Sequence, residues 1–244
     1  MDLQWLPQDI STYGPQIDSA IKLIFYTVGI SLVLAEGTLI AFALMYRRKP
    51  GRRAYFNRGE TGRELAWVLV PALIVLALDL GIDVAGARSW DIVKEAAPKP
   101  DLTVRVTAMR YGWNFTYPGP DGVFGTADDI QQAFALQVPA GKVVRLILTS
   151  QDVIHSFYVP ELRLKQDVVP GREITAWFEA TRPGNYEIVC SQLCGPLHFA
   201  MKGALGVQTQ EAFRDWMDHQ VAANAPHGAK PANKIESSKP GKEG

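Results

Sequence analysis

Two cysteines, a histidine and a methionine lie within one short segment of this 244-residue chain. The segment runs from Cys190 to Met201, reads CSQLCGPLHFAM, and has the spacing C-x-x-x-C-x-x-x-H-x-x-M. Thiolate, imidazole and thioether together are typical ligands of copper electron-transfer sites, whereas zinc prefers four firm nitrogen and sulfur ligands. Gly195 and Pro196 favour a loop, which can direct several side chains at one point. The segment therefore predicts a metal site, with copper favoured over zinc.

A second imidazole comes from His155, in the segment DVIHSF. Each residue also has a purely structural interpretation. The two cysteines, the only ones in the chain, could form a disulfide. Met201 could fill the core, and His155 could be an interior histidine. The joint occurrence of these types, in this spacing and order, favours the metal site.

Two long apolar segments occupy the first third of the sequence, from Ala20 to Tyr46 and from Leu65 to Ala87. At 1.5 Å per residue the first spans roughly 40 Å, which is enough to cross a bilayer. Glu36 is its ionisable interior residue and should face protein rather than lipid. Asp79 and Asp83 weaken the second segment, for which a buried soluble helix is the alternative.

The loop between these segments is strongly basic. Its single acid is Glu60, against seven bases: Arg47, Arg48, Lys49, Arg52, Arg53, Arg58 and Arg63. Short basic loops stay on the cytoplasmic side of a membrane. The sequence therefore predicts a two-pass protein whose chain after about Arg88 lies on the periplasmic side.

The remainder of the chain predicts an all-β domain, because short apolar runs alternate with Pro and Gly. The predicted strands read LTVRVTAM, FALQVP, KVVRLILTS, HSFYVP, EITAWFEA and GNYEIVC. A final amphipathic helix is expected over 211–222, followed by a tail whose composition is typical of disorder. The formal net charge of zero argues against a nucleic-acid partner.

These patterns divide the chain into five parts. They are an N-terminal extracytoplasmic segment (1–19), a transmembrane hairpin with a basic loop (20–88), a linker (89–101), the metal domain with its final helix (102–222) and a disordered tail (223–244).

Four separate motifs now carry a family resemblance. They are DVIHSF followed by VP, KQDVVPGR, the Cys190–Met201 loop, and an E-x-x-W-x-x-x-P pattern that runs from Glu64 to Pro71. Over about residues 15–222 the chain resembles cytochrome c oxidase subunit II. The resemblance implies a two-helix transmembrane hairpin followed by an all-β cupredoxin-like Greek-key sandwich, held in the cell inner membrane. It implies that electrons pass from cytochrome c, or another one-electron donor, through a binuclear copper centre (CuA). Haem in oxidase subunit I then receives them, for oxygen reduction coupled to proton translocation.

The resemblance also assigns the copper ligands. Cys190 and Cys194 would bridge two copper ions, His155 and His198 would each bind one, and Met201 would be a weak ligand. The backbone carbonyl of Gln192 would complete the set. The family usually has glutamate at this last position, where its side chain helps to hold magnesium at the junction with subunit I. Gln192 offers only an uncharged amide oxygen to such an ion.

Two further roles follow from the resemblance. Tyr111 stands where the family has the tryptophan that receives electrons, and Trp113 matches a second tryptophan of that motif. The alternative is that this aromatic cluster is a core strand. Glu64 matches an acid that admits protons from the cytoplasmic side. It could equally cap a helix with Thr61.

Other interpretations remain open beside these. Asp121, Asp128 and Asp129 lie in an apparent hairpin insertion (118–130) and predict either a calcium site or a solvated turn. A Sco-type copper chaperone also combines C-x-x-x-C with histidine, but it has one membrane helix and a thioredoxin-like fold. Quinol oxidase subunit II lacks the copper ligands, and nitrous oxide reductase has a much longer soluble chain.

Overall fold

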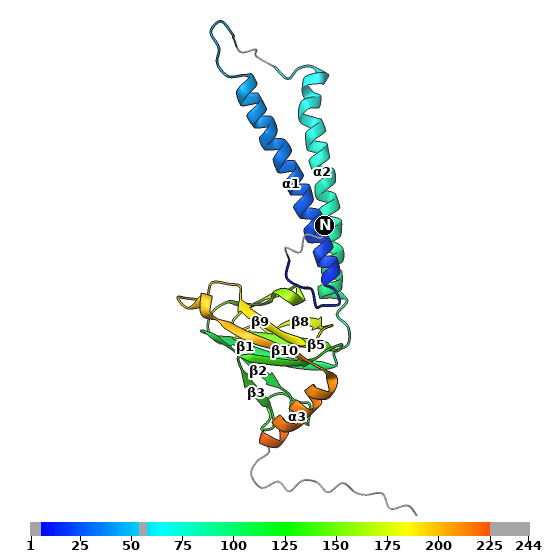
Figure 1. Ribbon diagram of the computed structural model, residues 1–244, viewed down its shortest axis with the longest axis vertical. Helices are drawn as coiled ribbons and strands as arrows, with labels where there is room; N and C mark the ends of the chain where they lie inside the picture. The colour runs from blue at the N-terminus through cyan, green and yellow to red at the C-terminus, as the bar shows by residue number, and fades with distance from the viewer. Residues whose placement is uncertain (1–5, 54–57, 225–244) are drawn as a thin grey trace, which may run out of the picture.

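The computed structural model describes residues 6–53 and 58–224, which form a pair of long helices standing on a β-sandwich (Figure 1). Helix α1 runs over Gly14–Met45 and α2 over Gly62–Trp90, and α2 continues into a π-helical turn, η1, over Asp91–Glu95. Both are long and apolar enough to cross a membrane. The predicted tail lies, apart from its first two residues, outside the described residues.

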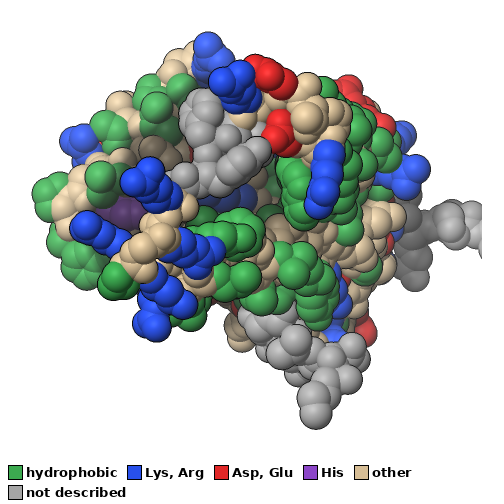
Figure 2. Space-filling view, turned by 90° about the horizontal axis from the view of Figure 1, so that it is seen from above, with side chains coloured by type: hydrophobic (Ala, Val, Ile, Leu, Met, Phe, Trp, Pro, Cys, Tyr) green, Lys and Arg blue, Asp and Glu red, His purple; other side chains and the backbone are tan. Residues whose placement is uncertain are grey.

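Local sequence signals set the ends of these helices. Pro15 lies in the first turn of α1, where its missing N–H is not needed. Thr61 and Glu64 form a reciprocal capping box at the start of α2. In the view from above, Lys and Arg side chains outnumber acidic ones on the visible face (Figure 2).

Ten strands form two five-stranded sheets in the described part of the chain. The first sheet has the order β3-β2-β1-β5-β8, with the bounds Ile130–Ala133, Gly112–Tyr117, Leu102–Met109, Val143–Ser150 and Ile174–Glu179. The second has the order β4-β10-β9-β6-β7, with the bounds Ala135–Pro139, Lys202–Gln208, Gly184–Cys190, His155–Val159 and Leu164–Val168. The pairs β1–β5 and β4–β10 are parallel. Between the two strands of each pair, the chain passes through the other sheet. The predicted helical hairpin followed by a Greek-key sandwich is confirmed.

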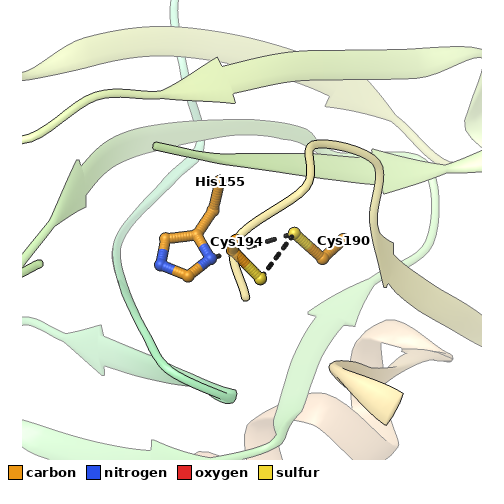
Figure 3. A group of neighbouring side chains, drawn as sticks. All are labelled: His155, Cys190 and Cys194. Atoms are coloured by element: carbon orange, nitrogen blue, oxygen red, sulfur yellow. Dashed lines mark hydrogen bonds between the residues drawn. The ribbon is translucent and has the colours of Figure 1, made fainter. Parts of the chain in front are cut away.

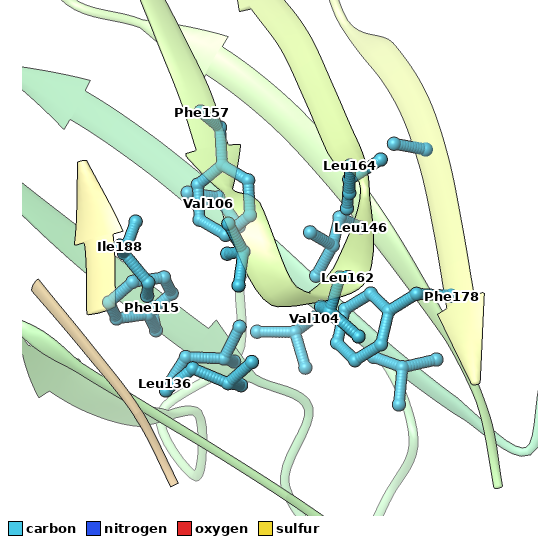
Figure 4. Close-up of a cluster of buried hydrophobic side chains, with 14 of the residues drawn as sticks. Val104, Val106, Phe115, Leu136, Leu146, Phe157, Leu162, Leu164, Phe178 and Ile188 are labelled. Atoms are coloured by element: carbon cyan, nitrogen blue, oxygen red, sulfur yellow. The ribbon is translucent and has the colours of Figure 1, made fainter. Parts of the chain in front are cut away.

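Alternating side chains fill the space between the sheets. Strand β5 alternates strictly between buried and half-buried residues, as a strand with one face on a core should. The inner side chains are fully buried and interdigitate across the sheets (Figure 4), among them Val106, Leu146, Phe157 and Phe178. This core holds the strands that carry the metal-binding segment.

The boundaries differ from the prediction at several places. Helical structure continues to Glu95, so the linker predicted from residue 89 begins only after it. The final helix, α3, extends over Gln210–Asn224. Strands β3, β7 and β10 were not predicted, because they are short or have charged and glycine residues that weaken the alternating pattern. Strand β2 was expected only as the alternative for the aromatic cluster around Trp113.

Residues 6–13, which precede α1, pack against the sandwich. Ile10 and Tyr13 are 1% and 2% exposed and join the hydrophobic core. Ser11 forms a β-bridge with Ala180, at the end of β8. We call residues 6–13 the N-terminal arm.

Candidate metal centre

The predicted metal ligands come from two strand ends and one loop. His155 is the first residue of β6, and Cys190 is the last residue of β9. Cys194, His198 and Met201 lie in the loop that connects β9 to β10. His155, Cys190 and Cys194 converge on one point (Figure 3), and each is buried. The sandwich therefore supplies two fixed ligands, and the loop supplies the rest.

Two sulfur atoms form the middle of the cluster. The Sγ atoms of Cys190 and Cys194 are 3.9 Å apart. The Nδ1 atom of His155 lies 3.8 Å from the sulfur of Cys190, and that of His198 lies 3.6 Å from the sulfur of Cys194. The Met201 thioether sulfur is 3.8 Å from Cys194 Sγ.

The backbone completes this arrangement. The carbonyl oxygen of Gln192 lies 3.2 Å from Cys190 Sγ. The other four predicted ligand groups therefore surround the sulfur pair.

The two cysteines are free thiols rather than a disulfide. Their separation of 3.9 Å is about twice the bonded S–S distance of about 2.05 Å, and both are unpaired. Burial, followed by the neighbouring Cys190 thiol, raises the pKa of Cys194 to about 11. The thiolate is the form that binds a metal, so a bound metal would have to displace this proton. The disulfide interpretation is wrong for this structure.

The donor set fits copper. Soft thiolates and a thioether with two imidazoles favour copper over magnesium, calcium or manganese. Both histidines present Nδ1 to a sulfur, which leaves Nε2 free to bond elsewhere. For His155 that second nitrogen contacts the Asp152 carboxylate at 2.8 Å. A carboxylate of this kind fixes the ring and tautomer of a ligand histidine.

Asp152 is a site residue that the sequence reasoning missed. Partial burial raises its pKa, but hydrogen bonds with His155 and from the backbone of Val153 and Arg110 outweigh this and lower the pKa to about 2. Arg110 was missed too, and its Nε donates to the carbonyl of Cys194 at 2.9 Å. The available signal was an acid three residues before a ligand histidine, within DVIHSF.

An open hollow lies beside the cluster, lined in part by Arg110, Asp152, Leu193 and Cys194. Gln192 also lines it and has an exposed side chain. Asp152 is its one carboxylate among the described lining residues, and its oxygens already accept hydrogen bonds. This chain therefore offers a hard cation at this place only the amide oxygen of Gln192 and backbone oxygens.

The two aromatic candidates occupy different environments. Trp113 is 1% exposed and packs edge-on against His155 and Phe157. It belongs to the core, so it cannot touch an electron donor at the surface. Tyr111 is half-buried, and its hydroxyl lies so close to Gly195 that a Cβ there would be 2.6 Å from it. Of the two residues, Tyr111 is the one between the surface and the loop of predicted metal ligands.

Glu64 lies far along the chain from this cluster, at the start of α2. Its carboxylate accepts from the backbone N–H of Thr61 at 3.1 Å, and its own N–H donates to the Thr61 hydroxyl at 3.4 Å. The predicted capping box is therefore present, and the carboxylate remains half-buried beside the basic loop.

The three aspartates of the 118–130 segment bond to their own turn. Asp121 accepts from the Val123 N–H, Asp129 accepts from the Gly125 N–H, and Asp128 accepts from the Thr126 hydroxyl. The last bond contributes most to the lowered pKa of Asp128. These contacts are those of a closed solvated turn. Within residues 6–53 and 58–224, the grouping of acids, histidines and cysteines that could hold a metal is His155, Cys190 and Cys194.

Comparisons with known proteins give the family. The model for "Cytochrome C oxidase subunit II, periplasmic domain" matches residues 124–207. Cytochrome c oxidase subunit 2 of Thermostichus vulcanus is 33% identical over 91% of this chain and 80% of that relative. The subunit 2 of a Synechocystis species is also 33% identical, over 90% of this chain and 63% of that relative. An alternative cytochrome c oxidase subunit 2 of Bradyrhizobium diazoefficiens is 27% identical.

Among solved structures, the periplasmic domain of subunit II of cytochrome oxidase of Bradyrhizobium japonicum is 29% identical, with a TM-score of 0.47. It covers 53% of this chain and 99% of its own. The sequence relationship to the Thermostichus protein extends over both the helices and the sandwich. The chain therefore belongs to the cytochrome c oxidase subunit II family.

Proposed function

We propose that this chain is the electron-accepting subunit of a respiratory terminal oxidase in the cell inner membrane. Its sandwich would receive electrons from cytochrome c, or a similar one-electron donor, at a two-copper centre. It would pass them to haem in subunit I, where oxygen reduction is coupled to proton translocation. The observation that supports this most is the convergence of four candidate ligand groups around the Cys190 and Cys194 sulfur pair, which makes six with the two sulfurs.

The residues have distinct roles in this proposal. Cys190 and Cys194 would bridge both ions, His155 and His198 would each hold one, and Met201 and the Gln192 carbonyl would act as weaker ligands. When bound, two copper ions with shared thiolates would take up one electron between them with little change of geometry. The protein's contribution is rigidity. Cys190 ends a core strand, and Asp152 and Arg110 hold His155 and the loop backbone.

Copper content and electron paramagnetic resonance test this centre. The full-length chain should bind two copper ions and show one unpaired electron shared by two copper nuclei. Cys190→Ser or Cys194→Ser should abolish that signal. Leu193→Ala is a matched control, because Leu193 is 77% exposed in the same loop. Zinc alone, or a single-copper spectrum in the unmodified chain, would contradict the proposal.

Tyr111 is the proposed point where electrons enter. An aromatic ring at the rim can contact a donor, and its hydroxyl can bond to water or backbone. Its position beside Gly195 brings the ring next to the ligand loop. Tyr111→Ala should slow reduction of copper by the donor while copper content is retained, and Tyr111→Phe should behave like the unmodified chain. An unchanged rate in Tyr111→Ala would remove Tyr111 from the path.

Glu64 is the proposed point where protons enter from the cytoplasmic side. Its carboxylate both caps α2 and stands beside the basic loop. Glu64→Gln keeps an acceptor for the Thr61 N–H but loses the titratable group. Turnover should fall in Glu64→Gln although α2 is intact. Unchanged turnover would leave Glu64 as a cap alone.

A magnesium ion at the interface with subunit I would have to take its charged ligands from other subunits, because here the family's glutamate is Gln192. Manganese replacing magnesium in the assembled oxidase gives a resonance signal that reports this site. Gln192→Glu should tighten manganese binding, since it restores a charged oxygen ligand. Equal binding in both forms would show that Gln192 lies outside any such site.

A further inference from the structure

Arg163 makes a set of contacts that none of the roles above requires. Its side chain is 6% exposed, and it pairs with the Asp18 carboxylate through two bonds, Nε to Oδ1 at 2.6 Å and Nη2 to Oδ2 at 3.0 Å. Its remaining donors reach the carbonyls of Pro160 and Pro7, each at 2.6 Å. A bidentate arginine–carboxylate pair fixes direction as well as distance.

The backbone of Arg163 gives an independent sign that its side chain matters. Its φ is +54°, in the left-handed region. That conformation costs free energy for residues with a Cβ atom, and glycine adopts it freely. Arginine stands at this position nevertheless, so its guanidinium has to offset the strain.

The two partners belong to different parts of the molecule. Asp18 lies near the start of α1, the first membrane helix. Arg163 lies in the turn that joins β6 to β7, and β6 begins with the copper-binding candidate His155. The ion pair therefore connects the base of a membrane helix to the hairpin that carries a metal ligand. In Figure 1 the start of α1 stands directly beside the sandwich.

The N-terminal arm extends this connection by backbone pairing. The Ile10 N–H donates to the Glu161 carbonyl at 3.0 Å, and the Thr181 N–H donates to the Ile10 carbonyl at 2.7 Å. The Thr12 N–H donates to the Glu179 carbonyl at 3.2 Å. The arm thus behaves as an added edge segment of the sandwich, and the chain then enters α1, where Asp18 meets Arg163.

Trp177 joins the same region to the second helix. Its carbonyl accepts from the Tyr13 hydroxyl at 3.3 Å, and the two rings meet edge-on with centroids 5.2 Å apart. Its Nε1 donates to the carbonyl of Val93, in the turn that ends α2, at 2.9 Å. Both membrane helices therefore attach to one edge of the copper domain.

We propose that the Arg163–Asp18 pair is a latch that sets the orientation of the copper domain on its membrane anchor. The inference rests on the proposed function, since orientation matters only if electrons pass from this domain to a partner in the membrane. Without the latch the domain would stay attached through the linker and the Trp177 contacts, but with a wider range of orientations. The two residues are positioning residues, because neither contacts the copper ligands.

Amide hydrogen exchange on the full chain tests the latch without using copper. In Arg163→Gln the amides of Ile10 and Thr12 should exchange at least about tenfold faster, because the arm opens locally. Arg163→Gly provides a second variant that relieves the backbone strain while it removes the guanidinium. It should also open the arm although the sandwich core stays protected. Arg105→Gln is the matched control, because it breaks a partly exposed ion pair with Glu173, at the opposite end of β8 from the arm.

Electron transfer in the assembled oxidase tests the function of the latch. In Arg163→Gln and Arg163→Gly, copper content and reduction by the donor should match the unmodified oxidase. Onward transfer to subunit I should fall about tenfold or more, as misplacement of a reacting centre does. The charge swap Asp18→Arg with Arg163→Asp should recover part of the rate, because aspartate tolerates the left-handed region.

Unchanged amide exchange in the arm would overturn the latch, and so would an opened arm with unchanged onward transfer. A fall in onward transfer that the charge swap does not recover, with the core exchanging faster, would also overturn it, because the effect would then be general destabilisation. Failure of the proposed function looks different. In that case the unmodified oxidase itself would show no copper reduction by a donor.

Discussion

Valine and leucine side chains occupy opposite environments in the two parts of this chain. In α1 and α2, Val33 is 72% exposed and Leu73 is 61% exposed. In the sandwich, Val106 and Leu146 are fully buried. The sandwich buries its apolar side chains in its own core. The helices instead need an apolar environment from outside, which a bilayer or neighbouring subunits provide. One part of the molecule carries its own core, and the other depends on its surroundings.

The prediction with the largest expected effect removes one large apolar side chain from each part of the molecule. Phe157 is fully buried and packs edge-on against Trp113. Phe157→Ala should lower the free energy of unfolding of the sandwich by about 3–5 kcal/mol. Leu73→Ala in α2 should leave it nearly unchanged. Urea unfolding of the full chain in detergent measures both, and equal losses would contradict the view that only the sandwich carries its own core.

A second prediction concerns Asp152, which holds the candidate ligand His155 in the sandwich. Asp152→Asn keeps the size of the side chain but removes the charge that faces His155 Nε2. Copper affinity should fall about 10–100-fold, as it does when such supporting groups are lost. Asp128→Asn, in the turn between β2 and β3, is the control and should bind copper normally. Competition with a copper chelator gives the affinities, and equal values would show that Asp152 does not support the site.

A smaller effect is expected at the start of α2. Thr61→Ala removes the side chain that accepts from the Glu64 N–H, and should cost about 1 kcal/mol locally. Amide exchange in the first turn of α2 should accelerate, while the sandwich is unaffected. Thr38→Ala is the control, because Thr38 lies in mid-helix and bonds only to its own helix, at Leu34. Equal acceleration of amide exchange in Thr61→Ala and Thr38→Ala would show that the capping hydrogen bond does not specifically stabilise the start of α2.

The smallest predicted effect lies where the two parts join. The backbone N–H of Val143 and then the Lys142 ammonium hold the pKa of Asp101 below its usual range. A carboxyl with a lowered folded-state pKa stabilises above its unfolded pKa and loses that contribution as the pH falls through the folded value. Between about pH 5 and about pH 3 the unmodified chain should therefore lose slightly more stability than Asp101→Asn. Parallel acid unfolding curves for the two forms would contradict this.

Hydrophobic pattern and residue type allowed much of this architecture to be predicted. The helices followed from two long apolar segments, and most core strands followed from alternating residues such as those of β1 and β5. Strand β10 was not predicted, because Gly203 and Gly206 weaken its alternating pattern and its place in the sheet depends on pairing with the distant β4. The helical structure after α2 was not predicted, because Ile92 and Val93 pack against the sandwich rather than forming a linker.

The candidate site, too, could be predicted from the sequence only in part. The ligand loop could be read from spacing alone, because its residue types are rare together. The roles of Asp152 and Arg110 could not, since charged residues are common and their contacts arise only when β1, β6 and the loop meet. For Trp113 the core-strand alternative is the one the structure supports, since the residue is buried. The motif left both interpretations open, because it gives residue type but not the side of the strand.

The parallel pairing of β4 with β10 also fixes an order of events during biosynthesis. Residues 135–139 cannot find their partner until residues 202–208 have been made, and such distant pairings form slowly. His155 is synthesised well before Met201, so the ligand set is incomplete until the last strand is in place. A chain that crosses the membrane while unfolded therefore cannot have its predicted metal site complete beforehand. The candidate ligands come together on the far side, only after β10 has paired with β4.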